Sequence, residues 1–419
     1  MGAKYEDVTG LKRLVMTYTF IDNKDISMCC GCSACADVCV VSAIDFEYGI
    51  DGARYPHVDM AKCVSCGMCR NVCPIKEKPA IPEPEFKKKA FALVIEPEQQ
   101  HLKSASGGAF EAIATALHGE YADLMIAGAA WGDDLRVCHK LVSYDDRDIF
   151  KKSKYIQSDC KGIYKEVKQK LNEGVHVLFT GTPCQLAALR NYLRKDYDNL
   201  FLVDLICHGA PGELIFEKYI QELNSKRNAR AIRATFRYKE KDLYGEVHSK
   251  YLRIEFDNGK VLKEQAKINP YLRGFHSGLF YRESCYSCKY ANTGRLGDIT
   301  IGDYWRIQEL NPKYVDYTGV SCMLVNTKKG LSLLDKMADC KLFETDVEAL
   351  CKRNGQMVSP SKKHPSRNFF ISEMDSESFE GLMDRCVKKE SGYKLVLSAI
   401  LPGKLKRSVK RLRKNMVTN

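Results

Sequence analysis

The chain has 419 residues, of which 65 are Lys or Arg and 53 are Asp or Glu, so its formal net charge is +12. Its length and its 45% content of hydrophobic residues exclude an intrinsically disordered chain and a small disulfide-stapled secreted fold. It contains 19 cysteines and no apolar run long enough to cross a bilayer. We therefore expect a cytoplasmic protein that keeps its cysteines reduced for metal binding.

Eight cysteines near the N-terminus form an internal repeat. The run Cys29, Cys32, Cys35 and Cys39 recurs 34 residues later as Cys63, Cys66, Cys69 and Cys73. This spacing is typical of ferredoxins with two 4Fe-4S clusters, in which the fourth cysteine of each run ligates the other cluster. We assign a first set, Cys29, Cys32, Cys35 and Cys73, and a second set, Cys39, Cys63, Cys66 and Cys69, to one cluster each. A structural zinc module is the less favoured alternative, because zinc sites usually use two separated pairs of ligands.

The residues around these runs complete a small domain over residues 1–75. Cys30 lies inside the first run, but the repeat favours Cys29 as the ligand. Gly31, Ser33, Ala34, Gly67 and Met68 let backbone N–H groups approach the sulfurs. The segments 44–48 and 54–59 predict a short hairpin between the runs. Residues 76–89 are rich in proline and charge and predict a linker.

From residue 90 onward, apolar strands alternate with helical patterns. We expect strands at 90–95, 122–131, 175–181 and 200–207 and helices at 107–118, 161–172, 185–195 and 213–224. This order predicts an α/β domain over 90–228 with a mainly parallel sheet. Strand patterns at 232–240, 250–258 and 297–305 and a helix at 328–338 predict a smaller mixed α+β lobe over 229–375, followed by a helix and a basic tail over 376–419.

Four further cysteines stand at informative positions. Cys184 follows the strand at 175–181, and Cys207 ends the next strand. If these strands are neighbours, both thiols lie on one rim of the sheet. Cys285 and Cys288 form a C-x-x-C pair. Together these four, the third set, predict a third 4Fe-4S cluster; buried free thiols, a redox dithiol and a zinc site are alternatives.

Two loops at the N-termini of predicted helices have the composition of phosphate-binding turns. They are Ser104–Gly108 and Thr180–Gln185. Ordinary helix caps have the same composition, so each signal alone is weak. Clusters transfer single electrons, whereas most organic substrates take two, and a flavin is the usual converter. We therefore hypothesise that the α/β domain binds a flavin and that these two loops contact it.

Several motifs in this order resemble the coenzyme F420 hydrogenase/dehydrogenase beta-subunit family. They are SASGGAF, KYIQSD, TGTPCQLAAL, LICHGAPG, RESCYSCKY and LGDITIGDYW, between about residues 90 and 370. The resemblance implies bound FAD, an iron–sulfur cluster beside it, and reduction of a conjugated acceptor. It implies that Cys184, Cys207, Cys285 and Cys288 ligate that cluster. It also implies flavin contacts from Ser106, Gly107, Gly108, Lys154, Gln157, Thr180, Gly181 and Thr182.

We therefore expect an iron–sulfur flavoprotein oxidoreductase. It would pass electrons between a ferredoxin-like donor, the clusters and FAD to a two-electron small-molecule acceptor, either a deazaflavin coenzyme or another conjugated substrate. An electron-transfer subunit that serves a partner redox subunit, or an oxidoreductase-like protein of surface polysaccharide biosynthesis, is the alternative. His208 is a candidate acid/base group near the flavin, with a hydrogen-bonded core or loop histidine as the alternative. The segment 303–305 is a candidate for the floor of the acceptor pocket, with packing as the competing role.

The basic tail is a separate candidate for function. Gly403–Asn419 holds seven Lys or Arg residues and no acid. Its amphipathic spacing predicts peripheral contact with the inner face of a membrane, or else a solvated tail. Because much of the positive charge gathers there, the net charge does not predict a nucleic-acid partner.

Overall fold

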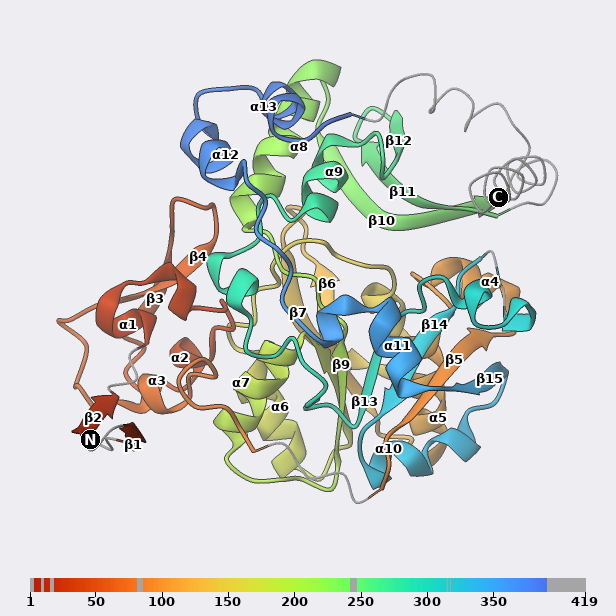
Figure 1. The fold of residues 1–419 in the computed structure, drawn as a ribbon, viewed down its shortest axis with the longest axis horizontal. Coiled ribbons are helices and arrows are strands. Elements are labelled where there is room, and N and C mark those ends of the chain that lie inside the picture. The colour runs from red at the N-terminus through yellow and green to blue at the C-terminus, as the bar shows by residue number, and fades with distance from the viewer. Residues whose placement is uncertain are drawn as a thin grey trace.

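The computed structural model describes residues 4–8, 11–15, 19–80, 86–241, 247–314, 316 and 318–389. Figure 1 shows a small N-terminal unit beside a large sheet with helices on both faces, and a further lobe above that sheet. The predicted basic tail and the middle of the predicted linker lie outside the described residues. Within the described part of the chain, no helix combines the length and the apolar composition that crossing a bilayer requires.

The N-terminal unit repeats its own backbone, as the cysteine spacing predicts. Helices α2 (Ala34–Asp37) and α3 (Met68–Asn71) are single turns placed 34 residues apart. Each begins after a residue in the left-handed conformation, Ser33 with φ 64° and Gly67 with φ 74°. The two cysteine runs therefore share one local structure.

Strand pairs complete the N-terminal unit. The expected hairpin is present as β3 (Ile44–Tyr48) paired antiparallel with β4 (Arg54–Val58). Tyr55 of β4 stacks on Phe20 of α1 (Phe20–Asn23), with ring centroids 4.9 Å apart. A second antiparallel pair precedes α1 and consists of β1 (Lys4–Val8) and β2 (Leu11–Val15).

Eight strands form the large sheet: β5 (Lys89–Ile95), β6 (Met125–Trp131), β7 (Val137–Ser143), β8 (Val177–Gly181), β9 (Leu200–Leu205), β13 (Ile299–Asp303), β14 (Ser321–Val325) and β15 (Cys340–Thr345). Their order is β15-β5-β14-β13-β9-β8-β6-β7. The central strands β13, β9, β8 and β6 are parallel, whereas the pairs toward both edges are antiparallel. The sheet is therefore mixed, and the expectation of a mainly parallel sheet is corrected.

Side chains that alternate along these strands fill two cores. On β8, Phe179 packs with helices α6 (Ile163–Asn172) and α7 (Pro183–Leu193), whereas Leu178 packs with α5 (Ala109–Glu120) on the other face. All five residues of β8 are buried, as expected for a strand covered on both faces. Two short helices extend the layers, α10 (Lys328–Ser332) on the α5 side and α11 (Val347–Arg353) on the opposite side.

The third part is a lobe formed by the segment between β9 and β13 together with two helices that follow β15. Its elements are α8 (Glu213–Arg227), β10 (Ala231–Lys241), β11 (Val247–Phe256), β12 (Val261–Gln265), α9 (Pro270–Ser277), α12 (Arg367–Glu373) and α13 (Phe379–Cys386). The three strands are antiparallel, as the sequence predicts. Its core is largely aromatic and includes Phe216, Phe236, Tyr271 and Phe379.

The domain boundary expected near residue 228 does not mark the end of the large sheet, because later strands also belong to that sheet. The sequence patterns place the segments that form β13, β14 and β15 in the smaller C-terminal lobe, but all three belong to the large sheet. β13 pairs in parallel with β9, although a whole lobe separates the two strands in the sequence. The helix α13, which the sequence groups with the tail, packs in that lobe against α8 and α9.

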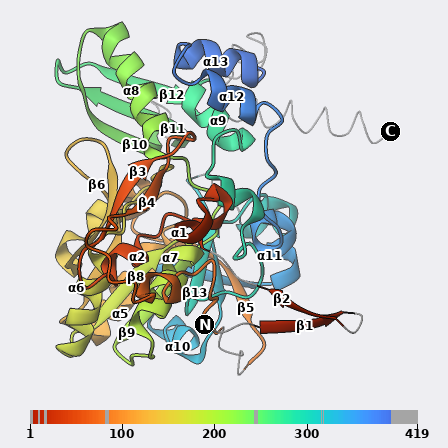
Figure 2. The same ribbon diagram turned by 90° about the vertical axis from the view of Figure 1, so that its left-hand side faces the viewer.

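The N-terminal unit packs on the face of the sheet that α6 and α7 cover (Figures 1 and 2). The carboxylate of Asp37, at the end of α2, accepts hydrogen bonds from the backbone N–H groups of Gly162 and Tyr164 at 2.6 and 3.2 Å, so it caps α6. In return, the Tyr164 hydroxyl donates to the Cys32 carbonyl at 2.9 Å. Arg54 forms an ion pair with Asp159 at 2.5 Å. These contacts hold the first cysteine run beside the carboxyl ends of β8 and β9.

Candidate functional site

The first cysteine pocket lies inside the N-terminal unit. The cysteines that line it are Cys29, Cys30, Cys32, Cys35, Cys69 and Cys73. The structure thus brings all four members of the first set together. Burial, and after it the neighbouring thiols of Cys29 and Cys73, raise the pKa of the Cys35 thiol above its ordinary value.

The backbone around this pocket suits an anionic cluster. Gly31 and Ser65 are left-handed, with φ of 68° and 53°, and Ser33 and Gly67 repeat this conformation two residues later in each run. Left-handed residues at such turns direct successive N–H groups into a concavity, a feature of many anion and iron–sulfur sites. The donors and the backbone therefore fit a 4Fe-4S cluster. The small residues that the sequence singles out lie at these turns.

The second set lies toward the surface of the unit. Cys66 is exposed, whereas Cys39, Cys63 and Cys69 are partly buried. The Cys39 sulfur accepts a hydrogen bond from the Ala43 N–H at 3.2 Å. Cys69 also lines the first pocket, so the second set adjoins the first.

A second cysteine pocket, with an empty volume of about 660 Å³ that opens to solvent, collects the third set. Cys184 lies in the first turn of α7 directly after β8, and Cys207 follows β9 by two residues. Because β8 and β9 are parallel neighbours, both thiols lie on one rim, as expected. Cys285 and Cys288 come from the short 3-10 helix Glu283–Ser287 and the residue after it. All four line this pocket.

Cys30 also lines the second pocket, which the sequence did not predict. Its thiol lies beside the thiols of Cys32, in the first set, and Cys184, in the third. Cys30 lines the first pocket as well. One side chain therefore joins the two cysteine pockets. The sequence shows the extra cysteine within the first run. That its thiol reaches the third set follows only from the packing of the N-terminal unit on α7.

The thiols of the third set are held where they ionise poorly. Burial raises the pKa of Cys285 to about 12, and burial followed by the thiols of Cys285 and Cys184 raises the pKa of Cys207. Arg295 lines the same pocket, but its charge is already paired with buried Asp204 at 2.7 Å. Iron ligation requires thiolates, and a cationic iron–sulfur core offsets both their burial and their mutual repulsion. The donor set therefore fits such a core.

A single metal ion would need a tighter arrangement of ligands. Among the residues that the structure describes, no three His, Cys, Asp or Glu side chains are gathered as ligands of one ion are. The four thiolates of a 4Fe-4S cluster bind four different irons, so they surround a larger group than one ion.

The eight residues expected to contact a flavin lie on or between several different elements of the α/β domain. Gln157 and Thr182 line the second cysteine pocket. Thr180 and Gly181 are buried at the end of β8. The Lys154 ammonium donates to two carbonyls of the preceding turn at 3.0 and 2.9 Å, and burial lowers its pKa to about 7.

The remaining three, Ser106, Gly107 and Gly108, pack against β14 and β5. A methyl group on Gly107 would stand 2.1 Å from the Leu93 carbonyl oxygen and 2.4 Å from the Ser321 nitrogen. The Ser321 hydroxyl accepts a hydrogen bond from the Gly107 N–H at 2.9 Å. Ser106 donates to a carbonyl of the same segment at 2.8 Å. Close packing thus accounts for these small residues without a phosphate.

Three basic side chains, which sequence reasoning missed, gather on the segment from α4 (Glu98–Lys103) to residue 106; we call Lys152, Arg237 and Lys239 the basic group. Lys239 donates to the carbonyls of residues 101 and 106 at 3.1 and 2.8 Å, and Arg237 donates to that of residue 105 at 3.2 Å. Burial, and then the charges of Lys152 and Arg237, lower the pKa of Lys239 to about 7. Crowded cations of this kind favour a nearby anion.

His208 connects the basic group with the second cysteine pocket. It lines that pocket and lies beside the ion pair of Arg237 with Asp303, whose atoms are 2.8 Å apart. Burial lowers the pKa of His208. The Trp305 ring faces Arg237 at 5.6 Å, whereas Tyr304 is buried in the core beneath β14. Asp303 and Trp305 therefore adjoin the basic group, whereas Tyr304 packs in the core.

Comparisons with known proteins bear on both halves of the chain. A family described as the C terminus of the "Coenzyme F420 hydrogenase/dehydrogenase, beta subunit" matches residues 175–349, and one described as "4Fe-4S dicluster domain" matches residues 28–76. A chain of the F420-reducing NiFe hydrogenase complex from Methanosarcina barkeri, from a xenon-derivatised structure, is similar over 74% of this chain and 92% of its own length, with 15% identity and a TM-score of 0.42. No curated protein matches. Residues 175–349 thus belong to the coenzyme F420 hydrogenase/dehydrogenase beta-subunit family, which confirms the resemblance inferred from the motifs, and residues 28–76 form a 4Fe-4S dicluster domain.

Proposed function

We propose that the chain is an iron–sulfur flavoprotein oxidoreductase that transfers electrons between a ferredoxin-like donor and a two-electron acceptor. The first, second and third sets of cysteines each hold one 4Fe-4S cluster. The observation that carries the proposal is the position of Cys30, which joins the pocket of the first set to the pocket of the third. A 4Fe-4S domain that only served its own fold would not need such a connection.

The three sets follow one another from the surface inward. Cys66, in the second set, is exposed to an external partner. Cys69 of the same set lines the first pocket, and Cys30 connects that pocket with the third set. Electron transfer falls steeply with distance, so a continuous row of adjoining sites supports a relay. The direction of flow depends on the donor and acceptor.

FAD would convert single electrons into pairs at the inner end of this row. The basic group supports its binding, because Lys152, Arg237 and Lys239 would neutralise the diphosphate. His208 lies between the basic group and the third set. Gln157 and Thr182, which line the second pocket, are the predicted flavin contacts nearest the cysteines.

The first test is the composition of the full-length chain purified without oxygen. We expect about twelve irons and about one FAD per chain, measured by iron and sulfide assays and by acid release of the flavin. About eight irons would contradict the third cluster. Iron and sulfide without flavin would contradict the flavoprotein.

A cysteine variant separates the third cluster from the other two. Cys285→Ser is expected to lower the iron content to about eight and to leave the dicluster signals in the electron paramagnetic resonance (EPR) spectrum unchanged. The matched control is Cys340→Ser, since Cys340 lies on β15 outside both pockets and a serine can keep its hydrogen bond to the Met337 carbonyl. Full iron content in Cys285→Ser would contradict our assignment of the third set.

One observation favours a second candidate, an electron-transfer subunit that serves a catalytic partner. The eight expected flavin contacts are spread over separate parts of the domain. An isolated chain that contains clusters, lacks FAD and does not turn over any conjugated acceptor with an artificial donor would support this candidate.

A further inference from the structure

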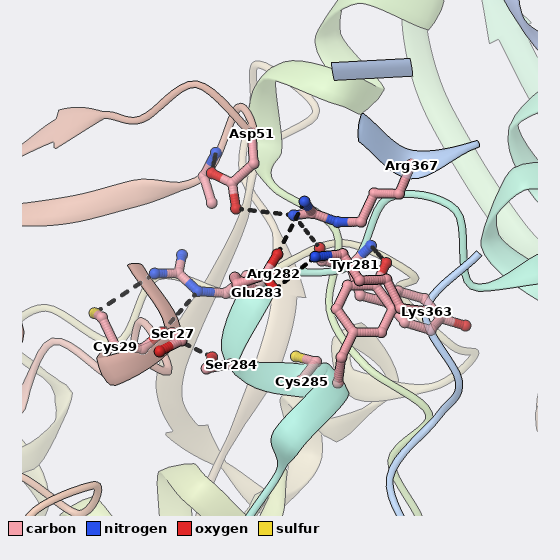
Figure 3. Close-up of polar contacts among 12 residues, drawn as sticks. Ser27, Cys29, Asp51, Tyr281, Arg282, Glu283, Ser284, Cys285, Lys363 and Arg367 are labelled. Carbon is pink, nitrogen blue, oxygen red and sulfur yellow. Dashed lines mark hydrogen bonds and ion pairs between the residues drawn. The ribbon is translucent and has the colours of Figure 1, made fainter. Parts of the chain in front are cut away.

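Arg282 lies three residues before Cys285, which belongs to the third set. Its side chain extends to Cys29, which belongs to the first set. Its side chain is fully buried. Nη2 lies 3.5 Å from the Cys29 sulfur, and Nε lies 3.4 Å from the Cys29 carbonyl oxygen. The guanidinium also stacks over the Tyr55 ring, with its carbon 4.5 Å from the ring centroid. Figure 3 shows the guanidinium directed toward Cys29, away from the Cys285 side chain.

The charge of Arg282 lacks a carboxylate partner. Over the described part of the chain, no Asp or Glu oxygen comes within ion-pairing distance of it, and its buried Nη1 has no hydrogen-bond partner. Arg367, in the same cluster of side chains, is also buried but lies 3.5 Å from Asp51 and 3.0 Å from Glu283 (Figure 3). A buried charge without a partner is strongly destabilising, so Arg282 calls for an anion that the side chains alone do not supply.

The backbone has made room for this contact. A methyl group on Gly31 would stand 2.8 Å from the Arg282 guanidinium carbon. The Ser284 hydroxyl donates to the same Cys29 carbonyl at 2.8 Å and fixes the segment against the first run. The position of Arg282 is therefore set from both sides, by the first run and by the segment that carries Cys285.

We propose that Arg282 is the counter-ion of the cluster held by the first set, and that it raises the reduction potential of this cluster. The inference rests on the proposed function, because it needs that cluster. A 4Fe-4S core with four thiolates carries two negative charges when oxidised and three when it has accepted one electron. A fixed cation beside the Cys29 sulfur stabilises the more negative, reduced form to a greater degree. Arg282 is thus a positioning and tuning residue rather than a ligand.

The test is redox potentiometry of the full-length, anaerobically purified chain, followed by EPR at low temperature. Arg282→Gln is expected to lower the reduction equilibrium constant of one of the two dicluster signals by at least about tenfold, which is ~59 mV for one electron. Arg282→Lys keeps the charge and is expected to restore most of the potential. The matched control is Lys363→Gln, because Lys363 is exposed and its partner Glu283 keeps its ion pair with Arg367, and we expect it to leave both potentials unchanged.

Each outcome decides between the proposals. An unchanged potential in Arg282→Gln, or an equal shift in Lys363→Gln, overturns the inference while the clusters themselves remain. Loss of the first cluster in Arg282→Gln with retention in Arg282→Lys supports a required positive charge, whereas loss in both variants shows a packing role and overturns it. A wild-type chain without cluster signals refutes the proposed function instead.

Discussion

Asp37 holds the N-terminal unit on the large sheet, and replacing it tests how firmly the unit is held. Its carboxylate bonds the N–H groups of Gly162 and Tyr164 in the first turn of α6. Gly162 offers no side chain to cap that helix, so the cap comes from the other domain. Asp37 is 4% exposed, so water does not readily replace it. We expect Asp37→Ala to loosen the contact between α2 and α6.

The magnitude follows from two lost hydrogen bonds. At about 1 kcal/mol each, their loss lowers the free energy of local opening by about 2 kcal/mol, which is roughly a 30-fold larger opening constant. Burial raises the pKa of Asp37, and stability that rests on a raised carboxyl pKa is present at low pH and lost as pH rises through that pKa. Burial thus disfavours the ionised form of Asp37. Asp37→Asn, which is neutral and keeps one acceptor oxygen, should accelerate exchange less than Asp37→Ala.

Hydrogen exchange of the peptide that contains Gly162 and Tyr164, followed by mass spectrometry, measures this opening directly. Asp45→Ala is the matched control. Asp45 also reaches from the N-terminal unit to the sheet domain, where it pairs with Lys161 at 3.1 Å, but its side chain is 82% exposed. We expect no measurable change for the control. Unchanged exchange in Asp37→Ala, or equal acceleration in both variants, would refute the reasoning.

Three further predictions address the sheet, the pH dependence and the relay. Gly107→Ala is expected to prevent folding, because the new methyl group meets backbone atoms at 2.1 and 2.4 Å, whereas Gly119→Ala in α5 meets nothing within 4 Å and should slightly raise the melting temperature. Burial lowers the pKa of His139 from 6.5 to about 4, so its contribution to stability is complete above pH 6.5 and declines as pH falls. In urea unfolding between pH 7.5 and 5.5, the wild type should therefore lose about 1 kcal/mol more than His139→Gln, and parallel losses would contradict this. Cys30→Ala should retain about twelve irons but slow the reduction of the third cluster in stopped-flow experiments; a loss of about four irons would instead make Cys30 a ligand.

Local patterns predicted the parts of the fold that local interactions determine. The 34-residue offset between the cysteine runs reappears as two equal one-turn helices. The apolar runs that contain Phe179 and Val203 are neighbouring buried strands, so Cys184 and Cys207 lie on one rim as expected. In each case the spacing of a few residues sets the backbone, and no distant contact is needed.

Which strands belong to the large sheet was harder to predict from the sequence, because strands pair with partners that are distant along the chain. The segment at 299–303 reads as an ordinary antiparallel strand, yet it pairs in parallel with β9 across an intervening lobe. Nothing in its own side chains distinguishes these two partners, since a strand buried on both faces is apolar in either case. The sheet is mixed because β13 pairs in parallel with β9 and antiparallel with β14.

The contacts that make the site a continuous whole were the least predictable. The Arg282 guanidinium meets a sulfur that lies 253 residues away in the sequence, and the Cys30 thiol lies between Cys184 and Cys32 of its own run. Both depend on one event, the packing of the N-terminal unit against the rim of β8 and β9. Once Asp37 and Tyr164 fix that packing, the first run must lie between Cys184 on one side and Arg282 on the other. The same docking that brings the first and third cysteine sets together therefore also delivers the buried positive charge to the first, so the connection between the sets and the tuning of the first cluster are two consequences of one interface.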